Sequence, residues 1–358
     1  MHLSLHKKAF KKALLICNGY EIYHDDLTDV VDDLYIIDPY HQKQNYLESL
    51  EVFKLYLKKN DINASAKIIY ASGLENKKDI KEYLDKEFYI CGNNLHKFTF
   101  LSNPYNLDKN LFLNNVVLPE VSKKFHYKYI SKKKNSSGGL NVGNNRISSN
   151  IYYQQHIPGN TYSVSFLSNE IESQILGFNQ LFSVKDNAKY PYLYAGAMTL
   201  NLDERELNYY KKWIDNFSSL YRLNGFCSID YKIYNNKIYI IDINPRLSGT
   251  YRLYKKQYKN LMHHHIGLTS GKLLSVNNKY YAYIVLFAKD DCVIDESIYN
   301  LKDISDTPAL GELIKKNMPI LTLNFKSNDR NKILIKIKDR IKSAMEIIDC
   351  YNVDLEYE

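Results

Sequence analysis

Apolar and polar positions change their period several times along the N-terminal part of the chain. The segments 11–19 and 64–72 hold continuous apolar runs that end in turn residues, as buried strands do. Between them, residues 45–61 carry apolar positions at helical spacing, and residues 76–87 show the same spacing ahead of a strand-like run at 88–94. This alternation of strands and helices predicts a small parallel α/β unit.

The middle of the chain mixes strand-like and helical patterns. A polar segment around Pro104 predicts the end of the first unit. Residues 125–132, 151–157 and 161–168 are strand-like, with apolar and polar residues interleaved. Residues 203–223 hold apolar positions with a period of about 3.6, which predicts a long amphipathic helix.

Two apolar runs and one periodic segment follow near the C-terminus. Residues 280–288 and 319–325 predict strands, and residues 328–349 predict a helix with lysines on its polar side. The apolar side of this helix comprises Ile333, Ile337, Ile341 and Met345.

The pattern is most informative in "GFCSIDYKIYNNKIYIIDINPRLSGT", residues 225–250. Two consecutive strands are predicted here, and a three-residue loop at 235–237 would place Asp230 directly opposite Asp242. Like charges opposite each other destabilise a hairpin. A cation is therefore expected between the two carboxylates.

Neighbouring polar residues extend this candidate metal site. Asp242 and Asn244 are two positions apart, so both point to the face that Asp230 shares. Two carboxylates and an amide oxygen are hard ligands that suit Mg²⁺, and Arg246 just beyond Pro245 suits a phosphoryl oxygen. The alternative is a surface hairpin with scattered polar residues, which its apolar second strand argues against.

Composition narrows the class of protein. The chain has 358 residues, a formal net charge of +8 and five scattered cysteines without CxxC spacing. The odd number of cysteines predicts free thiols in a reducing compartment, so a cytoplasmic protein is expected. The positive charge suits anionic ligands, but no compact basic module indicates nucleic-acid binding. No apolar stretch is long enough to predict a membrane span or a secretory signal.

Two further segments could contact a nucleotide. In "YKYISKKKNSSGGLNVGN", residues 127–144, a strand with Lys132 runs into small residues and glycines, which let backbone N–H groups approach an anion. By itself this segment is more typical of a solvated turn. "YYQQHIPGNTYSVSFL", residues 152–167, predicts by itself only a strand, a turn and a strand.

In this order the three segments resemble the ATP-grasp superfamily, with a glycine-rich flap, an adenosine-binding hinge and a metal-binding hairpin. The match covers residues 125 to 275. The metal ligands that the resemblance implies are Asp230, Asp242 and Asn244, and Arg246 would steady the transferring phosphoryl group. The implied nucleotide contacts are Lys132, Ser136, Ser137, Gly138, Gly139, Gln155 and Ile157.

The sequence departs from the family pattern at several of these positions. Asp242 replaces the usual Glu and is one methylene shorter. Lys133 stands where a Pro is common, which leaves open whether Lys132, Lys133 or Lys134 points inward. Gln155 stands where the family usually has a ribose-binding Glu.

The resemblance implies an α/β protein with α+β character in its catalytic part. A small parallel α/β domain at 1–104 would precede the ATP-grasp nucleotide- and metal-binding region at 105–275. Residues 276–358 would complete the fold with strands and a helix, and their apolar strands would suit a homodimer.

The implied activity is that of an ATP-dependent carboxylate–amine ligase using ATP and Mg²⁺, with Mn²⁺ as an alternative metal. A substrate carboxylate would take the γ-phosphoryl group to form an acyl phosphate, and an amine would displace phosphate to form an amide. ADP and phosphate would leave, and the partners would be a small-molecule acid and amine. A finer resemblance, carried by segments such as "KYPYLYAGAM" and "SDTPALGELIKKNMPILTL", links the chain to ATP-grasp proteins of tetrahydromethanopterin and methanofuran one-carbon metabolism, including tyramine–glutamate ligases.

Two other enzyme or binding functions stay open from the sequence. One is an ATP-grasp kinase with a non-carboxylate acceptor, and the other is an inactive ATP-binding regulatory protein. The loop "SDTPALG", with Asp306 and Pro308, is interpreted as a simple turn or as an edge of the acceptor site. The run His263–His265 favours a helix surface or a partly buried position over a metal site, because adjacent histidines cannot all converge on one ion.

Overall fold

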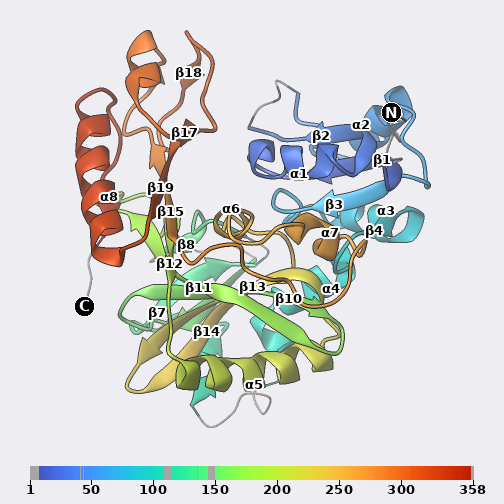
Figure 1. Ribbon diagram of the computed structural model, residues 1–358, viewed down its shortest axis with the longest axis horizontal. Helices are drawn as coiled ribbons and strands as arrows, with labels where there is room; N and C mark the ends of the chain where they lie inside the picture. Colours follow the sequence, from blue (N-terminus) through green and yellow to red (C-terminus); the bar gives the residue numbers. More distant parts are fainter. Residues whose placement is uncertain are drawn as a thin grey trace.

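The structure of the chain is a computed structural model. It describes residues 8–40, 42, 44–108, 115–134, 136–143 and 150–355. A small N-terminal unit lies against one side of a large sheet, and a C-terminal part extends that sheet beside it (Figure 1). No helix in these ranges is both long and apolar enough to cross a bilayer.

The N-terminal unit is built on a four-stranded sheet. Its strands are β1 (Phe10–Ile16), β2 (Val31–Ile37), β3 (Lys67–Tyr70) and β4 (Tyr89–Ile90), in the order β2-β1-β3-β4. All three pairings are parallel, which confirms the predicted parallel α/β unit. The sequence did not predict β2, because two adjacent aspartates near its start interrupt the apolar run.

Four helices pack around this sheet. The predicted helices at 45–61 and 76–87 are α2 (Leu50–Lys59) and α3 (Lys78–Glu87). Two shorter ones, α1 (His24–Thr28) and α4 (Leu95–Leu101), were not predicted. The helices α2, α3 and α4 share one core with the inner side chains of the sheet.

A large, mainly antiparallel sheet forms the body of the molecule. Its order is β17-β19-β15-β12-β11-β10-β13-β14-β5, and β20 pairs with β11. Its central strands are β10 (Thr161–Asn169), β11 (Ser173–Val184), β12 (Tyr194–Leu200), β13 (Asn224–Tyr234) and β14 (Lys237–Asn244). The outer strands are β5 (Val116–Val117), β15 (Tyr280–Phe287), β17 (Ile304–Ser305), β19 (Pro319–Ser327) and β20 (Val353–Asp354). The strands predicted at 161–168, 280–288 and 319–325 are present as β10, β15 and β19.

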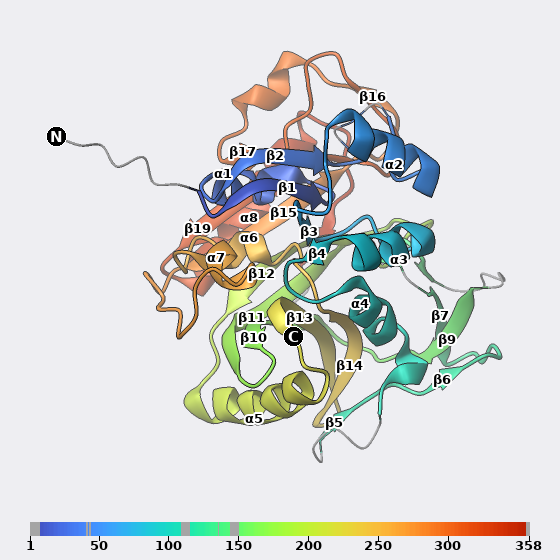
Figure 2. The same ribbon diagram turned by 90° about the vertical axis from the view of Figure 1, so that its right-hand side faces the viewer.

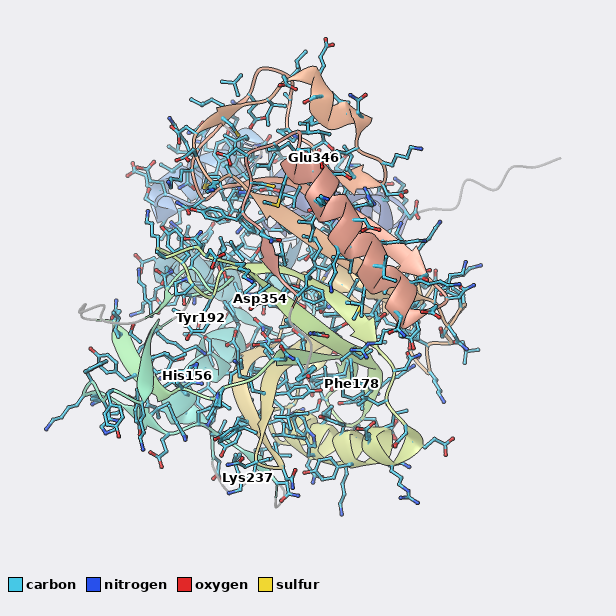
Figure 3. The ribbon with its side chains drawn as sticks, turned by 90° about the vertical axis from the view of Figure 1, so that its left-hand side faces the viewer. His156, Phe178, Tyr192, Lys237, Glu346 and Asp354 are labelled. Atoms are coloured by element: carbon cyan, nitrogen blue, oxygen red, sulfur yellow. The ribbon has the colours of Figure 1, made fainter. Side chains whose placement is uncertain are left out.

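The helix α5 (Glu204–Leu220) covers one face of this sheet, along its lower edge in Figure 1. Its buried side chains, among them Trp213 and Phe217, pack on apolar residues of β10, β11, β13 and β14. Phe178 of β11 contacts the ring of Tyr210 with centroids 4.6 Å apart, and Figure 3 shows Phe178 on this side of the sheet. One face of the central strands is thus apolar and covered.

The C-terminal helix α8 (Arg330–Met345) packs on β15 and β19 through Ile333, Ile337 and Ile341. Met345, which was predicted on the same face, is 42% exposed, and Ala344 fills that position in the core instead. A small two-stranded ribbon of β16 (Cys292–Val293) and β18 (Leu313–Ile314) stands beside these elements. Short 3₁₀ helices span Tyr20–Ile22, Pro104–Asn106 and Glu296–Asn300.

A separate antiparallel sheet carries the predicted flap and hinge. It consists of β6 (Val121–Ser122), β7 (Tyr129–Lys133), β8 (Val142–Gly143) and β9 (Ile151–Gln155), in the order β6-β9-β7-β8. Figure 2 shows this sheet set apart from the large sheet, on the side of β14. The strands predicted at 125–132 and 151–157 are β7 and β9.

Candidate functional site

The hairpin of β13 and β14 pairs Asp230 directly with Asp242, as predicted. The predicted three-residue loop is wrong. The turn has two residues, Asn235 and Asn236, whose φ angles of 49° and 58° suit the tight turn of a two-residue hairpin. The register then shifts by one residue at a β-bulge at Ile241, and this bulge brings the two aspartates opposite each other.

The pairing places a row of polar side chains on the face opposite α5. Ser163 of β10 pairs with Asp230 on one side and with Asn179 of β11 on the other. Two residues further along the hairpin, Ser228 pairs with Asn244. Directly paired residues share a face of the sheet. The polar residues therefore converge on one side while apolar residues fill the other.

Burial makes the two carboxylates electrostatically unusual. Burial and the charge of Asp242 raise the pKa of Asp230 to about 7, while Lys132 and Arg246 oppose that rise. Burial likewise raises the pKa of Asp242. The Ser163 hydroxyl lies near enough to oppose the rise at Asp230, although it has no hydrogen-bond partner of ordinary geometry among the described residues. Lys132 and Arg246 together therefore do not offset the effect of burial on the pKa values of the two aspartates.

Lys132 is the lysine that points to this pair. Its Nζ donates a hydrogen bond of 2.8 Å to the carbonyl oxygen of Ile241, the bulge residue. Burial lowers the pKa of Lys132, and the two aspartates oppose that effect. Lys134 instead lies 5.5 Å from the ring centre of Tyr105.

Arg246 is buried where the hairpin meets the N-terminal unit. Its Nη2 donates to Oε1 of Glu75 at 3.2 Å, and its Nη1 donates to the carbonyl oxygen of Leu247. Its Cζ lies 5.6 Å from the ring centre of Phe98. Its Nε has no hydrogen-bond partner among the described residues. The guanidinium thus presents one open donor beside the carboxylate pair.

The glycine-rich loop between β7 and β8 lies against the segment that precedes β12. The N–H of Tyr194 donates to the carbonyl oxygen of Gly138 at 3.0 Å. Gly139 has a φ of +73°, and a Cβ there would overlap the carbonyl oxygen of Tyr192. Ser136 bonds back to Lys133 through its hydroxyl, and Ser137 lines the adjoining cavity.

The predicted hinge lies at the end of β9. Ile157 is buried and lines the cavity together with Gln155. The side-chain oxygen of Gln155 accepts a hydrogen bond of 3.3 Å from the N–H of Glu120. His156 and Tyr192, labelled in Figure 3, also line the cavity on this side of the molecule.

A cavity of about 870 Å³ joins these elements. Every residue predicted as a site residue lines it: Lys132, Ser136, Ser137, Gly138, Gly139, Gln155, Ile157, Asp230, Asp242, Asn244 and Arg246. Pockets for small ligands usually measure about 300–1,000 Å³, so this cavity can hold a nucleotide and a further small molecule. It also reaches the carboxyl ends of β1 and β3 through Asn18 and Ser72.

The residues present fit a hard divalent cation. Two carboxylates lie opposite each other, one with its pKa raised to about 7, and Nδ2 of the Asn244 amide donates to Asp230 Oδ2 at 3.5 Å. Within the described ranges, no three His, Cys, Asp or Glu side chains form a protein-only metal cage. Mg²⁺ commonly takes one or two carboxylates and completes its shell with water and phosphate oxygens.

The sequence did not identify several polar residues of the cavity region. The alternation of Ser163 and Ser165 with apolar residues in β10 is a usable signal for a polar strand face. Glu75, the partner of Arg246, gave no such signal, because 171 positions separate the two residues. Lys232 also lines the cavity and donates to the carbonyl oxygen of Gly159 at 2.6 Å.

Comparison with known proteins gives one family match. Residues 101–250 match the family model described as an ATP-grasp domain. An uncharacterized protein of Methanocaldococcus jannaschii is 27% identical over 271 residues, which cover 67% of this chain and 64% of that protein. The match thus spans slightly less than two thirds of the relative's length.

Solved structures with a similar fold cover almost the whole chain. The L-amino acid ligase from Bacillus licheniformis matches with a TM-score of 0.65 at 10% identity, covering 94% of this chain and 98% of that one. The biotin carboxylase domain of 2-oxoglutarate carboxylase from Hydrogenobacter thermophilus, solved with MgADP and bicarbonate, matches with a TM-score of 0.65 at 12% identity, covering 97% and 92%. At these identities the likeness concerns the fold, and it confirms the predicted fold class.

Proposed function

We propose that this chain, whose residues 101–250 match an ATP-grasp domain, is an ATP-dependent carboxylate–amine ligase of the ATP-grasp superfamily. It would join an acid and an amine through an acyl phosphate and release ADP and phosphate. The observation that supports this proposal most directly is the convergence of Asp230, Asp242, Asn244 and Lys132 at one cavity. The likeness to an L-amino acid ligase is consistent with the same chemistry.

Nucleotide and metal would share the polar face of β13 and β14. Asp230, Asp242 and Asn244 would hold Mg²⁺, which when bound neutralises the phosphate oxygens of ATP. Mn²⁺ has the same ligand preference and is the alternative. A protein of similar fold has been solved with MgADP, which is consistent with a magnesium nucleotide in this cavity.

The chain's own cations would do the remaining electrostatic work. Lys132 already lies at the carboxylate pair and would offset charge on the phosphates. Glu75 holds the guanidinium of Arg246 in place, and the open Nε–H of that guanidinium would donate to the transferring phosphoryl group. The flap residues 136–143 would cover the site and exclude water, which would otherwise hydrolyse an acyl phosphate.

An ADP-release screen tests this function. Purified protein with Mg²⁺ and ATP is offered acids and amines singly and in pairs, with glutamate and tyramine in the panel because of the resemblance to one-carbon ligases. We expect ADP release only when both an acid and an amine are present, with an amide as product. ADP release with an acceptor that lacks a carboxylate would indicate a kinase instead.

A variant of the proposed metal site and a matched control variant test the same function. Asp242→Asn should lower ADP release by about a hundredfold or more, since it removes charge that would be used in the transition state. Asp290→Asn, on an exposed aspartate outside the cavity, should leave it unchanged. Binding of Mg²⁺ and ATP without turnover across the whole panel would contradict the ligase proposal and favour a regulatory protein.

A further inference from the structure

A second charged cluster faces the same cavity and has no role in the nucleotide site. Arg252 lies on the short helix α6 (Tyr251–Tyr254), and Asp306 lies in the loop that follows β17. Arg252 Nη2 donates to Asp306 Oδ2 at 2.5 Å, and Arg252 Nη1 donates to Ser305 Oγ. Thr322 Oγ1 also donates to Asp306 Oδ2, at 2.6 Å. The two charged side chains are 11% and 18% exposed, so the pair is largely removed from water.

Each member of this pair keeps one unused polar atom. Nε of Arg252 and Oδ1 of Asp306 are buried, and neither has a hydrogen-bond partner within the described part of the chain. A buried donor or acceptor without a partner destabilises the folded protein, and more so when the group is charged. A donor and an acceptor left open on the same ion pair indicate a ligand that carries the complementary groups.

The cluster is close to the proposed metal site. Arg252 and Asp306 line the cavity that also contains Asp230. The guanidinium of Arg252 lies 5.3 Å from the ring centre of Tyr283, whose hydroxyl is 2.6 Å from that of Tyr194. The charges of Arg252, Asp306 and Asp230 all act on Tyr283. Tyr283 therefore lies near both the ion pair and Asp230.

The backbone holds Asp306 in an unusual conformation. Its φ is +53°, a region that residues other than Gly rarely adopt. Its N–H donates to Oε2 of Glu21 at 2.8 Å, so a residue of the N-terminal unit supports the loop. A non-glycine residue in this region carries a strain that the surrounding structure must hold, and such residues cluster at ligand sites.

We propose that this cluster binds a free α-amino acid, with its ammonium group on Asp306 Oδ1 and its carboxylate on Arg252 Nε. The inference rests on the proposed ligase function and names its amine substrate. In the reaction the amino nitrogen bonds to the acyl carbon while the carbon–oxygen bond to phosphate breaks, and phosphate leaves with the electron pair. Of the two protons that the ammonium group loses, one passes through Asp306 to water and the other leaves with the phosphate.

Charge balance favours an amino acid over other amines. Arg252 and Asp306 neutralise each other, so a zwitterion adds no net charge to the cluster, whereas a simple alkylammonium ion would leave a positive excess. Each ionised group loses hydration when it is buried, and this cost is offset only where the group meets an opposite charge and is hydrogen-bonded to it. The open donor and the open acceptor meet that condition.

Direct binding tests the inference without relying on turnover. The protein is loaded with Mg²⁺ and a non-hydrolysable ATP analogue, and the thermal shift is measured for the common α-amino acids. Each amino acid is compared with its N-acetyl derivative and its decarboxylated amine. We expect at least one free amino acid to stabilise the protein, and both derivatives to do so much less.

Two variants and their matched controls locate the site. Asp306→Asn keeps a residue that tolerates positive φ but removes the negative charge. Arg252→Lys keeps the positive charge but removes the Nε–H donor. Each should raise the apparent Kd for the amino acid roughly ten- to a hundredfold and leave the Kd for nucleotide unchanged. The controls are Asp303→Asn and Arg340→Lys, a pair outside the cavity in which Asp303 also has a positive φ of 48°.

The outcomes separate this inference from the ligase proposal. Three outcomes would overturn the inference. The wild type and both cluster variants could bind the amino acid equally, the derivatives could bind as tightly as the free amino acid, or no amino acid could bind at all. ADP release with an amine that is not an amino acid would leave the ligase proposal standing and refute this subsite. Amino-acid binding that the cluster variants abolish, in a protein that never releases ADP, would support the subsite and refute the ligase.

Discussion

Nζ of Lys132 donates a hydrogen bond of 2.8 Å to the carbonyl oxygen of Ile241, the residue that bulges from β14. One irregular position thus has two effects. It shifts the register so that Asp230 faces Asp242, and it offers an acceptor that draws a flap-strand lysine toward them. The bulge couples the hairpin of β13 and β14 to the sheet that would cover the nucleotide.

Replacement of this lysine should weaken nucleotide binding. Lys132→Met removes the cation next to the two carboxylates, and we expect the Kd for Mg²⁺-ATP to rise about ten- to a hundredfold, the value of a charged hydrogen bond. Isothermal titration calorimetry measures this change. Lys134→Met, whose side chain lies at Tyr105 outside the cavity, should bind as wild type does. Similar losses in both variants would show that the general positive charge of the flap matters and that the position of Lys132 does not.

Alanine substitutions at two adjacent glycines of the flap distinguish backbone strain from steric overlap of the new Cβ. Gly138 and Gly139 have φ angles of +66° and +73°, so alanine at either position should cost about 1 kcal/mol in backbone strain. Only at Gly139 would the new Cβ also overlap a backbone carbonyl, that of Tyr192. We expect Gly139→Ala to weaken ATP binding well beyond Gly138→Ala, which meets open space. Equal affinities in the two variants would mean that this contact has no part in binding.

The ion pair of Arg246 and Glu75 should contribute strongly to stability. Both side chains are less than a tenth exposed, at 7% and 9%, and Glu75→Gln would leave a buried guanidinium without its counter-ion. Such a loss costs about 3 kcal/mol of unfolding free energy. Glu170→Gln removes the partner of Arg222 in a pair that is 39% and 76% exposed, and should cost less than about 1 kcal/mol. Urea denaturation compares the two, and a similar loss in both would contradict the assignment.

His265 should make the stability of the protein depend on pH. It is 2% exposed on α7 (Leu261–His265), accepts a hydrogen bond from the N–H of Phe226 at 3.0 Å, and burial lowers its pKa to about 4. In the unfolded chain this histidine takes up a proton near pH 6.5, so its full contribution to the free energy of unfolding is present above that pH. As the pH falls toward 4, the free energy of unfolding decreases progressively, by about 3 kcal/mol in all.

The variant His265→Gln removes the titrating group and keeps an oxygen that can accept the Phe226 N–H. The difference in unfolding free energy between wild type and variant should shrink as the pH falls from 7 to 4. Urea titrations at several pH values measure it. A difference that stays constant over that range would mean that His265 does not titrate as a buried neutral side chain.

Local pattern was sufficient for much of the fold. Apolar runs in β1 and β3 and the periodic helix between them predicted the parallel N-terminal unit, because a buried strand and an amphipathic helix each leave a signal in consecutive residues. The start of α5 is equally local, since Asp203 and Glu206 form a capping box within one turn. Alternation along two neighbouring strands also placed Asp230 and Asp242 on the same face of one hairpin.

Tertiary structure decided the details that make the site. The hairpin turn is one residue shorter than predicted, and only a bulge at Ile241 restores the aspartate pairing. Arg246 meets Glu75 across 171 positions, and Arg252 meets Asp306 across 54. No local pattern encodes such contacts, because they depend on how separate units pack against each other. Sequence alone identified the residue types and their strand faces, whereas packing determined which charges lie together and which polar atoms stay open for a ligand.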